Sequence, residues 1–330
     1  MINDFFKKFL TKSSILDDYG IKYNHNCEIE IENINNNYSL SLLSNKTIIK
    51  CSGDDVENFL NTQFTNDIKN LNNNNDVILS GYCNPKGRLI SVFYIFQIDK
   101  DYYLYTTLDS REAVINKLNM YKMMSKVNFE IMDNILVGIT NIPENNNLNS
   151  IKPEVGKAIK HEDSIILRPT HDQIIIVSNL DSLISLINLK SIVILGYKSW
   201  DYLDIKNMIP FITTSKIESY TPQMVSLDLL NGVSFSKGCY PGQEIVARTH
   251  YLGKAKKCLY EIFINSQKDI DLSDNIIDKE KNSSVGDIIN ISKLSKKTYS
   301  CLTVLRKESI NKKLFVNNGG IAKIINSVEN

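Results

Sequence analysis

The chain has 330 residues, of which 42% are hydrophobic, and its formal net charge is +1. This length supports two or three domains with cores of their own, and the hydrophobic fraction excludes a disordered chain. A near-zero net charge provides no global positive field for nucleic acid, and the sequence has no run of roughly 18 apolar residues that would span a membrane. We therefore expect a globular protein with no membrane partner and no direct nucleic-acid partner.

The first 20 residues predict a cytoplasmic protein. They lack the long apolar core and small-residue cleavage site of a secretory signal. Lys7, Lys8 and Lys12 leave a mitochondrial presequence, and hence the mitochondrial matrix, as the alternative. Asp17 and Asp18 argue against that alternative because transit peptides are poor in acidic residues.

The cysteines and histidines predict a reducing compartment and no metal site. No C-x-x-C pair occurs, which argues against a zinc ribbon and, in a chain this long, against a disulfide scaffold. The four histidines show no metal-binding spacing either. The six cysteines are Cys27, Cys51, Cys83, Cys239, Cys258 and Cys301.

Strands alternate with single helices through the first two thirds of the chain. Apolar, β-branched and aromatic runs predict strands at 47–51, 77–82, 89–98, 102–107, 127–131, 135–140, 165–168 and 174–178. Helical spacing predicts helices over 56–60 and 183–189, and another capped by Asp109 with Glu112 in the capping-box position. Segments 70–76 and 141–153 are expected loops, and 84–87 an expected turn. The alternation indicates mixed sheets with helices on one face.

The pattern changes from residue 254 onward. Short apolar runs at 259–264, 288–291, 300–305, 314–316 and 321–325 are separated by polar loops and show no helical period. Such a pattern predicts a separate small all-β domain, either a barrel or a sandwich. We therefore divide the chain into α/β modules at 1–252, with room for two interleaved subdomains, and a β-domain at 253–330.

The most informative segment is KGCYPGQEIVAR, residues 237–248. Pro241 and Gly242 suit the two central positions of a type II turn, after which Gln243 begins a helix. Glu244 and Arg248 are four residues apart and are expected to pair along one helix face.

Cys239 lies just before that predicted helix, next to Gly238, which frees the backbone. Lys237 and Arg248 flank the thiol in sequence, and positive charge and free helix N–H groups both stabilise a thiolate. The segment therefore predicts a nucleophilic, redox-active or metal-touching cysteine. The alternative is that Cys239 is a small apolar residue buried in a core.

This segment resembles the signature of the YgfZ family, K-G-C-[FY]-x-G-Q-E-x-x-[AS]-R, and matches it at each fixed position, Tyr240 included. Similarity extends to segments 52–67, 83–88 and 221–235, so that it spans roughly residues 45–260. The family is similar in fold to the T-protein of glycine cleavage. The resemblance therefore implies an α+β fold, with mixed α/β modules arranged as a ring and a small C-terminal β-barrel.

The resemblance also implies a function. Members of the family are tetrahydrofolate-binding factors that support the synthesis or repair of iron–sulfur clusters in enzymes, including tRNA-modifying ones. For this chain it implies tetrahydrofolate or a derivative as cofactor, a reactive thiol at Cys239, and iron–sulfur enzymes or cluster-assembly proteins as partners. It implies a non-catalytic folate-dependent factor rather than an aminomethyltransferase.

The expected folate site lies in the segment 200–210, which resembles the family's W-x-x-L-x-[IL]-E-x-G-x-P stretch. Trp200 or Tyr202 would stack on a flat ring, with a core tryptophan as the alternative for Trp200. Two positions depart from the pattern. Lys206 replaces the glutamate that pairs with the pterin in the family. A lysine side chain cannot accept a hydrogen bond, so Asp204 is the candidate substitute. Met208 replaces a glycine and would crowd a close backbone approach.

The sequence leaves two other functions open. A folate-dependent one-carbon transferase is suggested by the implied fold, but the T-protein uses an aspartate just after the segment corresponding to 87–89, and residues 90–98 contain no carboxylate. A protein that carries its own cluster is suggested by the six cysteines, whose scatter matches no cluster spacing.

A short basic run follows the motif. Its simplest interpretation is a solvated face, and the functional one is attraction to an anion such as folate's glutamate tail or an RNA phosphate. The run comprises Arg248, His250, Lys254, Lys256 and Lys257.

Overall fold

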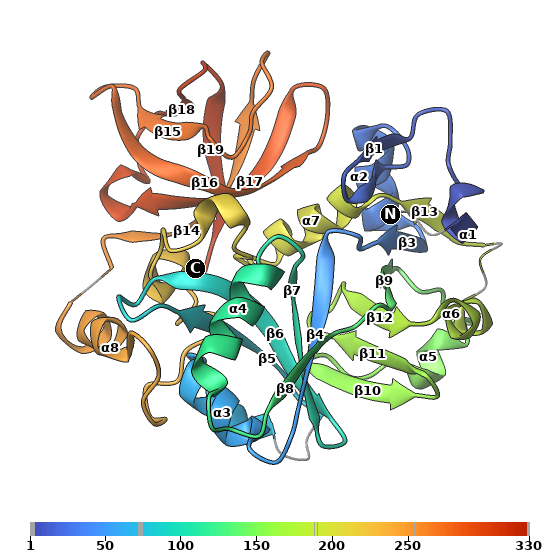
Figure 1. Ribbon diagram of the computed structural model, residues 1–330. Helices are drawn as coiled ribbons and strands as arrows, with labels where there is room; N and C mark the ends of the chain where they lie inside the picture. The colour runs from blue at the N-terminus through green and yellow to red at the C-terminus, as the bar shows by residue number, and fades with distance from the viewer. Residues whose placement is uncertain (1–3, 72–74, 188, 190, 254, 329–330) are drawn as a thin grey trace.

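The computed structural model describes residues 4–71, 75–187, 189, 191–253 and 255–328. Figure 1 shows three lobes around helix α7 (Tyr197–Lys206): a five-stranded sheet, a six-stranded sheet and a C-terminal barrel. Within the described residues, no helix combines the length and apolar character needed to cross a membrane. The α+β architecture with a C-terminal barrel, which the sequence predicts, is confirmed.

The five-stranded sheet is antiparallel, in the order β5-β6-β7-β4-β8. Helices α3 (Val56–Gln63) and α4 (Arg111–Lys122) cover one face, where their apolar residues form a cluster with the sheet. The other face packs toward the centre of the molecule, which is why β6 is apolar along nearly its whole length. The strands are β4 (Lys46–Ser52), β5 (Val77–Cys83), β6 (Leu89–Ile98), β7 (Asp101–Thr107) and β8 (Asn128–Ile131), and a 3-10 turn, η1, covers Ile68–Leu71.

The six-stranded sheet has the order β10-β11-β12-β9-β3-β13, and only its β3–β13 pair is parallel. Its outer face packs against α1 (Asp4–Lys7), α5 (Leu148–Ile151) and α6 (Leu180–Leu186). Because β3 and β4 follow one another in the chain but belong to different sheets, the two sheets interleave. The strands are β3 (Ser39–Leu42), β9 (Ile135–Thr140), β10 (Lys157–His161), β11 (Ser164–Arg168), β12 (Ile174–Ser178) and β13 (Val193–Leu195).

A small hairpin and one more helix complete the N-terminal part of the chain. The hairpin pairs β1 (Ile15–Asp17) with β2 (Gly20–Tyr23), and helix α2 (Cys27–Asn36) follows it and contacts α7. After α7, the chain passes through the 3-10 turns η2 (Thr214–Lys216) and η3 (Pro222–Val225) to helix α8 (Gln243–Leu252).

The C-terminal domain is a closed barrel in the order β14-β17-β16-β15-β18-β19, with its own apolar interior. Closure leaves no unpaired strand edge. The pairing of β16 with β17 is interrupted by a β-bulge between Ile288 and Asn290. The strands are β14 (Lys257–Asn265), β15 (Asn275–Asp278), β16 (Ser283–Lys293), β17 (Thr298–Arg306), β18 (Leu314–Val316) and β19 (Ile321–Ser327), with the 3-10 turn η4 at Lys307–Ser309.

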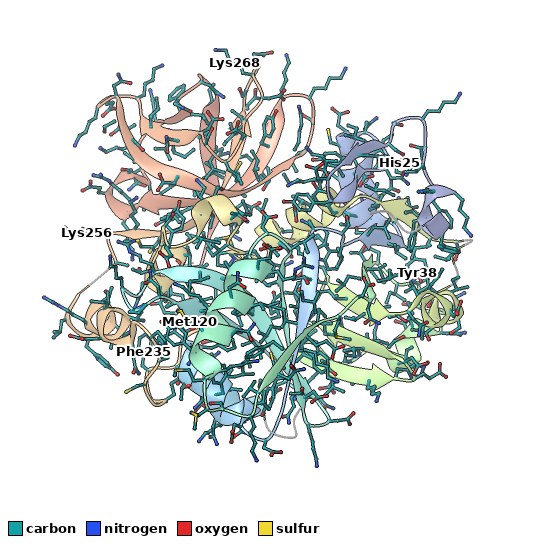
Figure 2. The ribbon with its side chains drawn as sticks, in the orientation of Figure 1. His25, Tyr38, Met120, Phe235, Lys256 and Lys268 are labelled. Atoms are coloured by element: carbon teal, nitrogen blue, oxygen red, sulfur yellow. The ribbon has the colours of Figure 1, made fainter. Side chains whose placement is uncertain are left out.

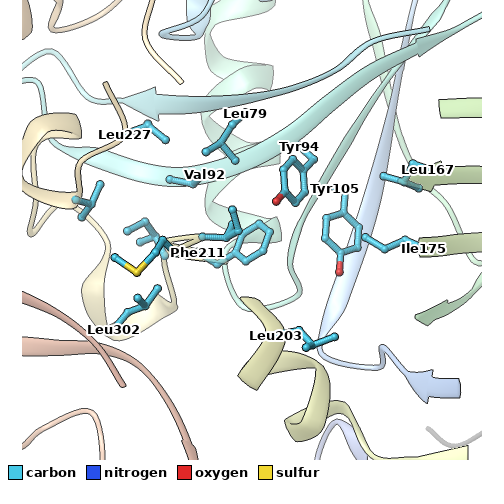
Figure 3. Close-up of a cluster of buried hydrophobic side chains, with 14 of the residues drawn as sticks. Leu79, Val92, Tyr94, Tyr105, Leu167, Ile175, Leu203, Phe211, Leu227 and Leu302 are labelled. Carbon is cyan, nitrogen blue, oxygen red and sulfur yellow. The ribbon is translucent and has the colours of Figure 1, made fainter. Parts of the chain in front are cut away.

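A shared core holds the three lobes together. Figure 3 shows side chains from both sheets, from α7 and from the barrel in one buried cluster, in which the rings of Phe211, Tyr94 and Tyr105 contact one another. Leu302 brings β17 into the same cluster, and Trp200 is fully buried within it. The lobes therefore share a core as well as contacting one another.

Several predicted elements need correction. Helix α4 begins after Ser110, whose carbonyl accepts the N–H of Val114 (3.0 Å), so Asp109 is not its cap. The segment 141–153, predicted as a loop, contains α5, and β15 was not predicted. Helix α6 begins earlier than expected because the side chain of Asn179 caps it, accepting from the N–H of Ser182 (2.8 Å). Residues 72–74 of one predicted loop, and residue 188 of the predicted helix, lie outside the described residues.

Candidate functional site

The motif loop makes the predicted type II turn. The N–H of Gln243 donates to the carbonyl of Tyr240 (3.1 Å), and Gly242 has φ 80° and ψ 5°. Helix α8 then begins at Gln243, as the sequence predicts. The turn therefore fixes how the loop enters α8.

Gly242 packs directly on the turn at 84–87. A Cβ atom at Gly242 would lie 2.5 Å from the carbonyl oxygen of Asn84 and from the backbone nitrogen of Gly87. The Asn84 side chain stiffens that turn by accepting the N–H groups of Lys86 (2.9 Å) and Arg88 (3.0 Å). Two segments that carry the family resemblance, far apart in the chain, thus meet backbone to backbone.

Lys237 anchors the loop to the end of α3. Its ammonium donates to the carbonyls of Asn61, Phe64 (2.7 Å) and Asn66 (2.8 Å). Burial lowers the pKa of Lys237 to about 8, but three carbonyls need three N–H donors, which only the ammonium form provides. The positive charge of Lys237 is therefore bound at the carboxyl end of α3, where the helix dipole favours a cation. The expectation that this charge stabilises a thiolate at Cys239 is not supported.

Cys239 is exposed and carries a free thiol, which excludes the interpretation as a buried core residue. Gly238 beside it is also exposed, and a Cβ atom there would meet nothing within 4 Å. Its φ is not in the left-handed region, so backbone freedom does not explain this glycine. The loop is thus held at Lys237 and at the buried Tyr240, and presents residues 238 and 239 to solvent.

The predicted pairing of Glu244 with Arg248 is not observed. Both side chains are exposed on α8, and no ion pair joins them among the described residues. Gln243 is half-buried at the start of the helix. These three residues shape the surface beside Cys239 without a polar network between them.

The basic run after the motif is mixed with aromatic rings. His250 stacks on Phe235 with ring centroids 3.6 Å apart, and Tyr251 meets His250 edge-on. Figure 2 shows Phe235 and Lys256 on the side of the molecule where α8 lies. Lys257 pairs with Asp287 (3.3 Å). Lys254, the remaining lysine of the run, lies outside the described residues.

A cavity of 260 Å³ lies where α7, the start of β4, the end of β7 and barrel strand β16 come together. Its volume is near the lower limit of about 300–1,000 Å³ for small-molecule sites, and suits a compact ring system. Residues from both α/β modules and from the barrel line it, among them Asn45, Lys46, Asp201, Asp204, Phe211 and Asn290. Of the predicted site residues, only Asp204 lines this cavity.

Two lysines and two aspartates form a charge network on the cavity wall. Lys46 pairs with Asp204 (2.7 Å) and more loosely with Asp201 (3.6 Å), and Lys198 pairs with Asp201 (2.9 Å). The side-chain N–H of Gln173 also donates to Asp204 (2.8 Å). The four charges balance, which makes their burial tolerable.

The pKa values of the two aspartates shift in opposite directions, because Asp201 is close to two lysines and Asp204 to one. Burial raises the pKa of Asp204, and Lys46 offsets this only in part. Burial would also raise the pKa of Asp201, but Lys198 and Lys46 outweigh it, so the net shift is downward. For Lys46, burial favours the neutral amine, but Asp204 and Asp201 together raise its pKa. Asp204 is therefore the carboxyl of the pair that binds a proton more readily.

Trp200 and Tyr202 do not line the cavity. Trp200 has no exposed surface, and a Cβ atom on Gly138 would lie 2.2 Å from its ring. Tyr202 is half-buried against the shared core. Stacking of either ring on a ligand stays a prediction, and the aromatic rings on the cavity wall are those of Tyr19, Tyr197 and Phe211.

The two departures from the family pattern have structural explanations. Lys206 is exposed at the end of α7 and pairs with Asp172 (3.6 Å). Met208 has φ 59° and follows the helix cap, where Ile209 donates its N–H to the carbonyl of Asp204 (2.8 Å). That left-handed position of a Schellman cap is what favours glycine here. The expectation that Met208 crowds a close backbone approach is therefore corrected: the position requires a positive φ, and Met208 adopts it while buried.

Sequence patterns gave no indication of several cavity residues. Asn45, Lys46 and Asn290 come from a loop, a strand start and a barrel strand, and no local motif contains them. Asp109, predicted as a helix cap, instead faces the cavity and accepts a hydrogen bond from the hydroxyl of Tyr19. Only the pairing of distant strands brings these side chains together.

The other cysteines are not arranged as a cluster site. Among the described residues, no group of three His, Cys, Asp or Glu side chains could hold a metal ion. Burial raises the pKa of the Cys83 thiol to about 12, and it also raises those of Cys51 and Cys301. The hypothesis of a chain that carries its own cluster therefore finds no ligand set in the described structure.

Comparison with known proteins gives both close sequence relatives and a fold relative. No family model matches the chain. The tRNA-modifying protein YgfZ of Aliivibrio fischeri (strain MJ11) is 30% identical over 232 residues, which cover 68% of this chain and 70% of that protein. The protein of the same name from Blochmanniella pennsylvanica (strain BPEN) is 32% identical over 227 residues, covering 66% and 68%.

A solved structure extends the fold comparison to nearly the whole chain. The glycine cleavage system aminomethyltransferase T from Bartonella henselae superposes with a TM-score of 0.75, covering 98% of this chain and 95% of that one. The sequence identity is 12%, so the likeness concerns the fold alone. The predicted T-protein-like fold is confirmed.

Proposed function

Because this chain belongs to the YgfZ family, we propose that it is a tetrahydrofolate-binding factor that supports the synthesis or repair of iron–sulfur clusters, including those of tRNA-modifying enzymes. The proposal joins two features of the chain, the central cavity as ligand site and the Cys239 loop as the point of contact with a protein partner. Iron–sulfur enzymes or cluster-assembly proteins are the proposed partners. The cytoplasmic location stays a prediction.

The make-up of the cavity wall is the observation that carries the proposal, because aromatic surface and hydrogen-bond acceptors together suit a pterin-like ring. The rings of Tyr19, Tyr197 and Phe211 offer apolar surface to a flat group. Asp204 offers a carboxylate as hydrogen-bond acceptor, which Lys206 cannot do. The buried amide oxygens of Asn45 and Asn290, two residues of the cavity wall, have no hydrogen-bond partner among the described residues. A ring with several N–H donors would satisfy these acceptors.

The thiol loop supports a role toward a macromolecule. None of the residues at 237–248 lines the cavity, and Cys239 lies exposed on a loop that Lys237 and Gly242 fix in place. A thiol presented in this way can be reached by another protein. We therefore propose that Cys239 acts on a partner, while the ligand occupies a separate site.

The alternative of a one-carbon transferase receives no support from β6. This strand, Leu89–Ile98, carries no carboxylate, and its side chains are buried along nearly its whole length.

Ligand binding is tested by titrating the purified protein with tetrahydrofolate and 5-formyl-tetrahydrofolate in a calorimeter, with the fluorescence of Trp200 as second probe. We expect micromolar affinity, weakened at least about tenfold by Asp204→Asn, because a charged hydrogen bond is worth about 1.5–3 kcal/mol. Asp172→Asn, at a half-buried aspartate that pairs with Lys206 and does not line the cavity, is the matched control and should bind as wild type does. No binding up to millimolar ligand would contradict the proposal.

The role of the thiol is tested by complementation. In a bacterial strain lacking its own YgfZ protein, wild type should restore the nucleoside made by a cluster-dependent tRNA-modifying enzyme. Cys239→Ser should not restore it, whereas Ser236→Ala, an exposed change in the same loop, should. Equal restoration by both variants would remove Cys239 from the proposal.

A further inference from the structure

Two asparagines on the cavity wall have side-chain amides whose orientation is fixed by hydrogen bonds. The side-chain N–H of Asn45 donates to Asp201 (2.9 Å), and that of Asn290 donates to the carbonyl of Phe211 (2.9 Å). Rotating either amide by half a turn would place an oxygen against an acceptor. The oxygen of each side chain is therefore the atom that remains available to accept a hydrogen bond from another partner.

Neither oxygen has a partner within the described residues. Both atoms are buried, and both residues line the cavity. Buried polar atoms are almost always hydrogen-bonded, and each exception needs an explanation. The wall of the cavity thus contains two buried amide oxygens without a partner among the described residues, next to the carboxylates of Asp201 and Asp204.

Local backbone features aim both side chains. The β-bulge in β16 lets the consecutive residues Ile289 and Asn290 lie on the same side of the strand, toward the cavity that both line, which a regular alternating strand would not allow. Ile291 follows on the other side of the strand and packs against the apolar interior of the barrel. The carbonyl of Asn45 accepts the N–H of Leu108 (2.8 Å), which ties the loop before β4 to the end of β7. The two asparagines therefore come from different parts of the fold and meet at one cavity.

We propose that Asn45 and Asn290 are the specificity-determining residues of this cavity and accept N–H groups of the ligand's ring. This inference rests on the proposed function, because it takes the ligand to be a tetrahydrofolate. The 2-amino group and ring N–H of its pterin supply donors of the required kind. The bound ring bridges the barrel, through Asn290, and the α/β modules, through Asn45.

The test pairs a change in the protein with a change in the ligand. The affinities of 5-formyl-tetrahydrofolate and of its 2-deamino-2-methyl analogue are measured by calorimetry for wild type, Asn45→Leu and Asn290→Leu. Wild type should lose at least about tenfold in affinity for the analogue. At least one variant should lose about tenfold for the parent ligand and much less for the analogue. Ile291→Val, an apolar neighbour on the same cavity wall, should bind both ligands within about threefold of wild type.

The possible outcomes separate this inference from the proposed function. If wild type binds both ligands equally, or if the variants weaken both ligands equally, the asparagines do not select the ligand, although folate binding stands. If wild type binds neither ligand, the proposed function fails and the inference fails with it. Should a leucine variant not fold, Asn45→Ala and Asn290→Ala take its place, with the same loss expected for the parent ligand and the same smaller loss for the analogue.

Discussion

Two glycines in the Cys239 loop differ sharply in the space around them. Gly242 has a left-handed backbone and touches Asn84 and Gly87, whereas a Cβ atom on Gly238 would meet open space. We expect Gly242→Ala to lower the free energy of unfolding by about 2–4 kcal/mol, from backbone strain and overpacking together. Gly238→Ala should change it by less than about 0.5 kcal/mol. Urea denaturation of both variants measures the difference.

Similar losses in the two variants would show that the loop does not pack on the 84–87 turn. A functional defect in Gly238→Ala with unchanged stability would instead indicate that a partner approaches the backbone beside Cys239. The two variants thus separate the role of the loop in stability from its role in contacting a partner.

At the scale of elements, Glu30 joins the starts of two helices. The carboxylate, fully buried on α2, accepts the backbone N–H groups of Asn24 (2.7 Å), His25 (2.8 Å) and Gly196 (3.0 Å). Gly196 is the N-cap of α7, the helix that carries the charged wall of the cavity. The position of α7 therefore depends on a buried carboxyl group.

This arrangement predicts a pH dependence. Burial raises the pKa of Glu30 from 4.5 to about 7, so the folded state holds the proton more tightly than the unfolded chain does. The stability contributed by Glu30 is then fully present below pH 4.5 and is lost as the pH rises through 7. Relative to Glu30→Gln, which does not titrate, wild type should lose about 2–3 kcal/mol between pH 5 and 7.5.

The measurement is urea denaturation of wild type and Glu30→Gln at both pH values. A constant difference between the two proteins would mean that the three N–H donors hold the carboxyl group ionised throughout. Other groups titrate in both proteins, so that only the difference between the two curves reports on Glu30.

Local patterns predict the strands of the five-stranded sheet and the turn at Pro241–Gly242 closely, because neighbouring residues encode them. They did not predict α1, α2, α7, β1, β2, β3, β10 or β13. Helix α5 was missed because one short turn inside a polar segment has no measurable period, and Asp109 was mistaken for a cap because Ser110 beside it can serve equally well.

At the scale of the whole molecule, the shared core predicts cooperative unfolding. Trp200 lies in the cluster that joins the lobes, and Leu302 brings the barrel into it. Cys301 is buried inside the barrel. Trp200 fluorescence and labelling of Cys301, mapped by mass spectrometry, should therefore report the same urea midpoint. Leu302→Ala should shift both by a loss of about 2–5 kcal/mol.

Separate midpoints for the two probes would show that the barrel unfolds on its own. In that case Leu302→Ala should move the Cys301 transition and leave that of Trp200 in place. Either pattern is read directly from the two curves.

The cavity could not have been predicted from the sequence, because it exists only once the lobes assemble. Asp204 was found through its neighbours in α7, whereas Asn45 and Asn290 lie far apart in the chain and share no motif. The Cys239 loop was recognisable because its residues are contiguous. Its anchoring by Lys237 was not, since the acceptors belong to the end of α3.

The separation of the thiol loop from the cavity has a kinetic consequence. Since no residue at 237–248 lines the cavity, the two sites do not compete for the same space. Under the proposed function, the small molecule and the protein partner can then bind in random order, with either event first. A chain built in this way would keep the proposed ligand through successive encounters with protein partners, without releasing it before each new one.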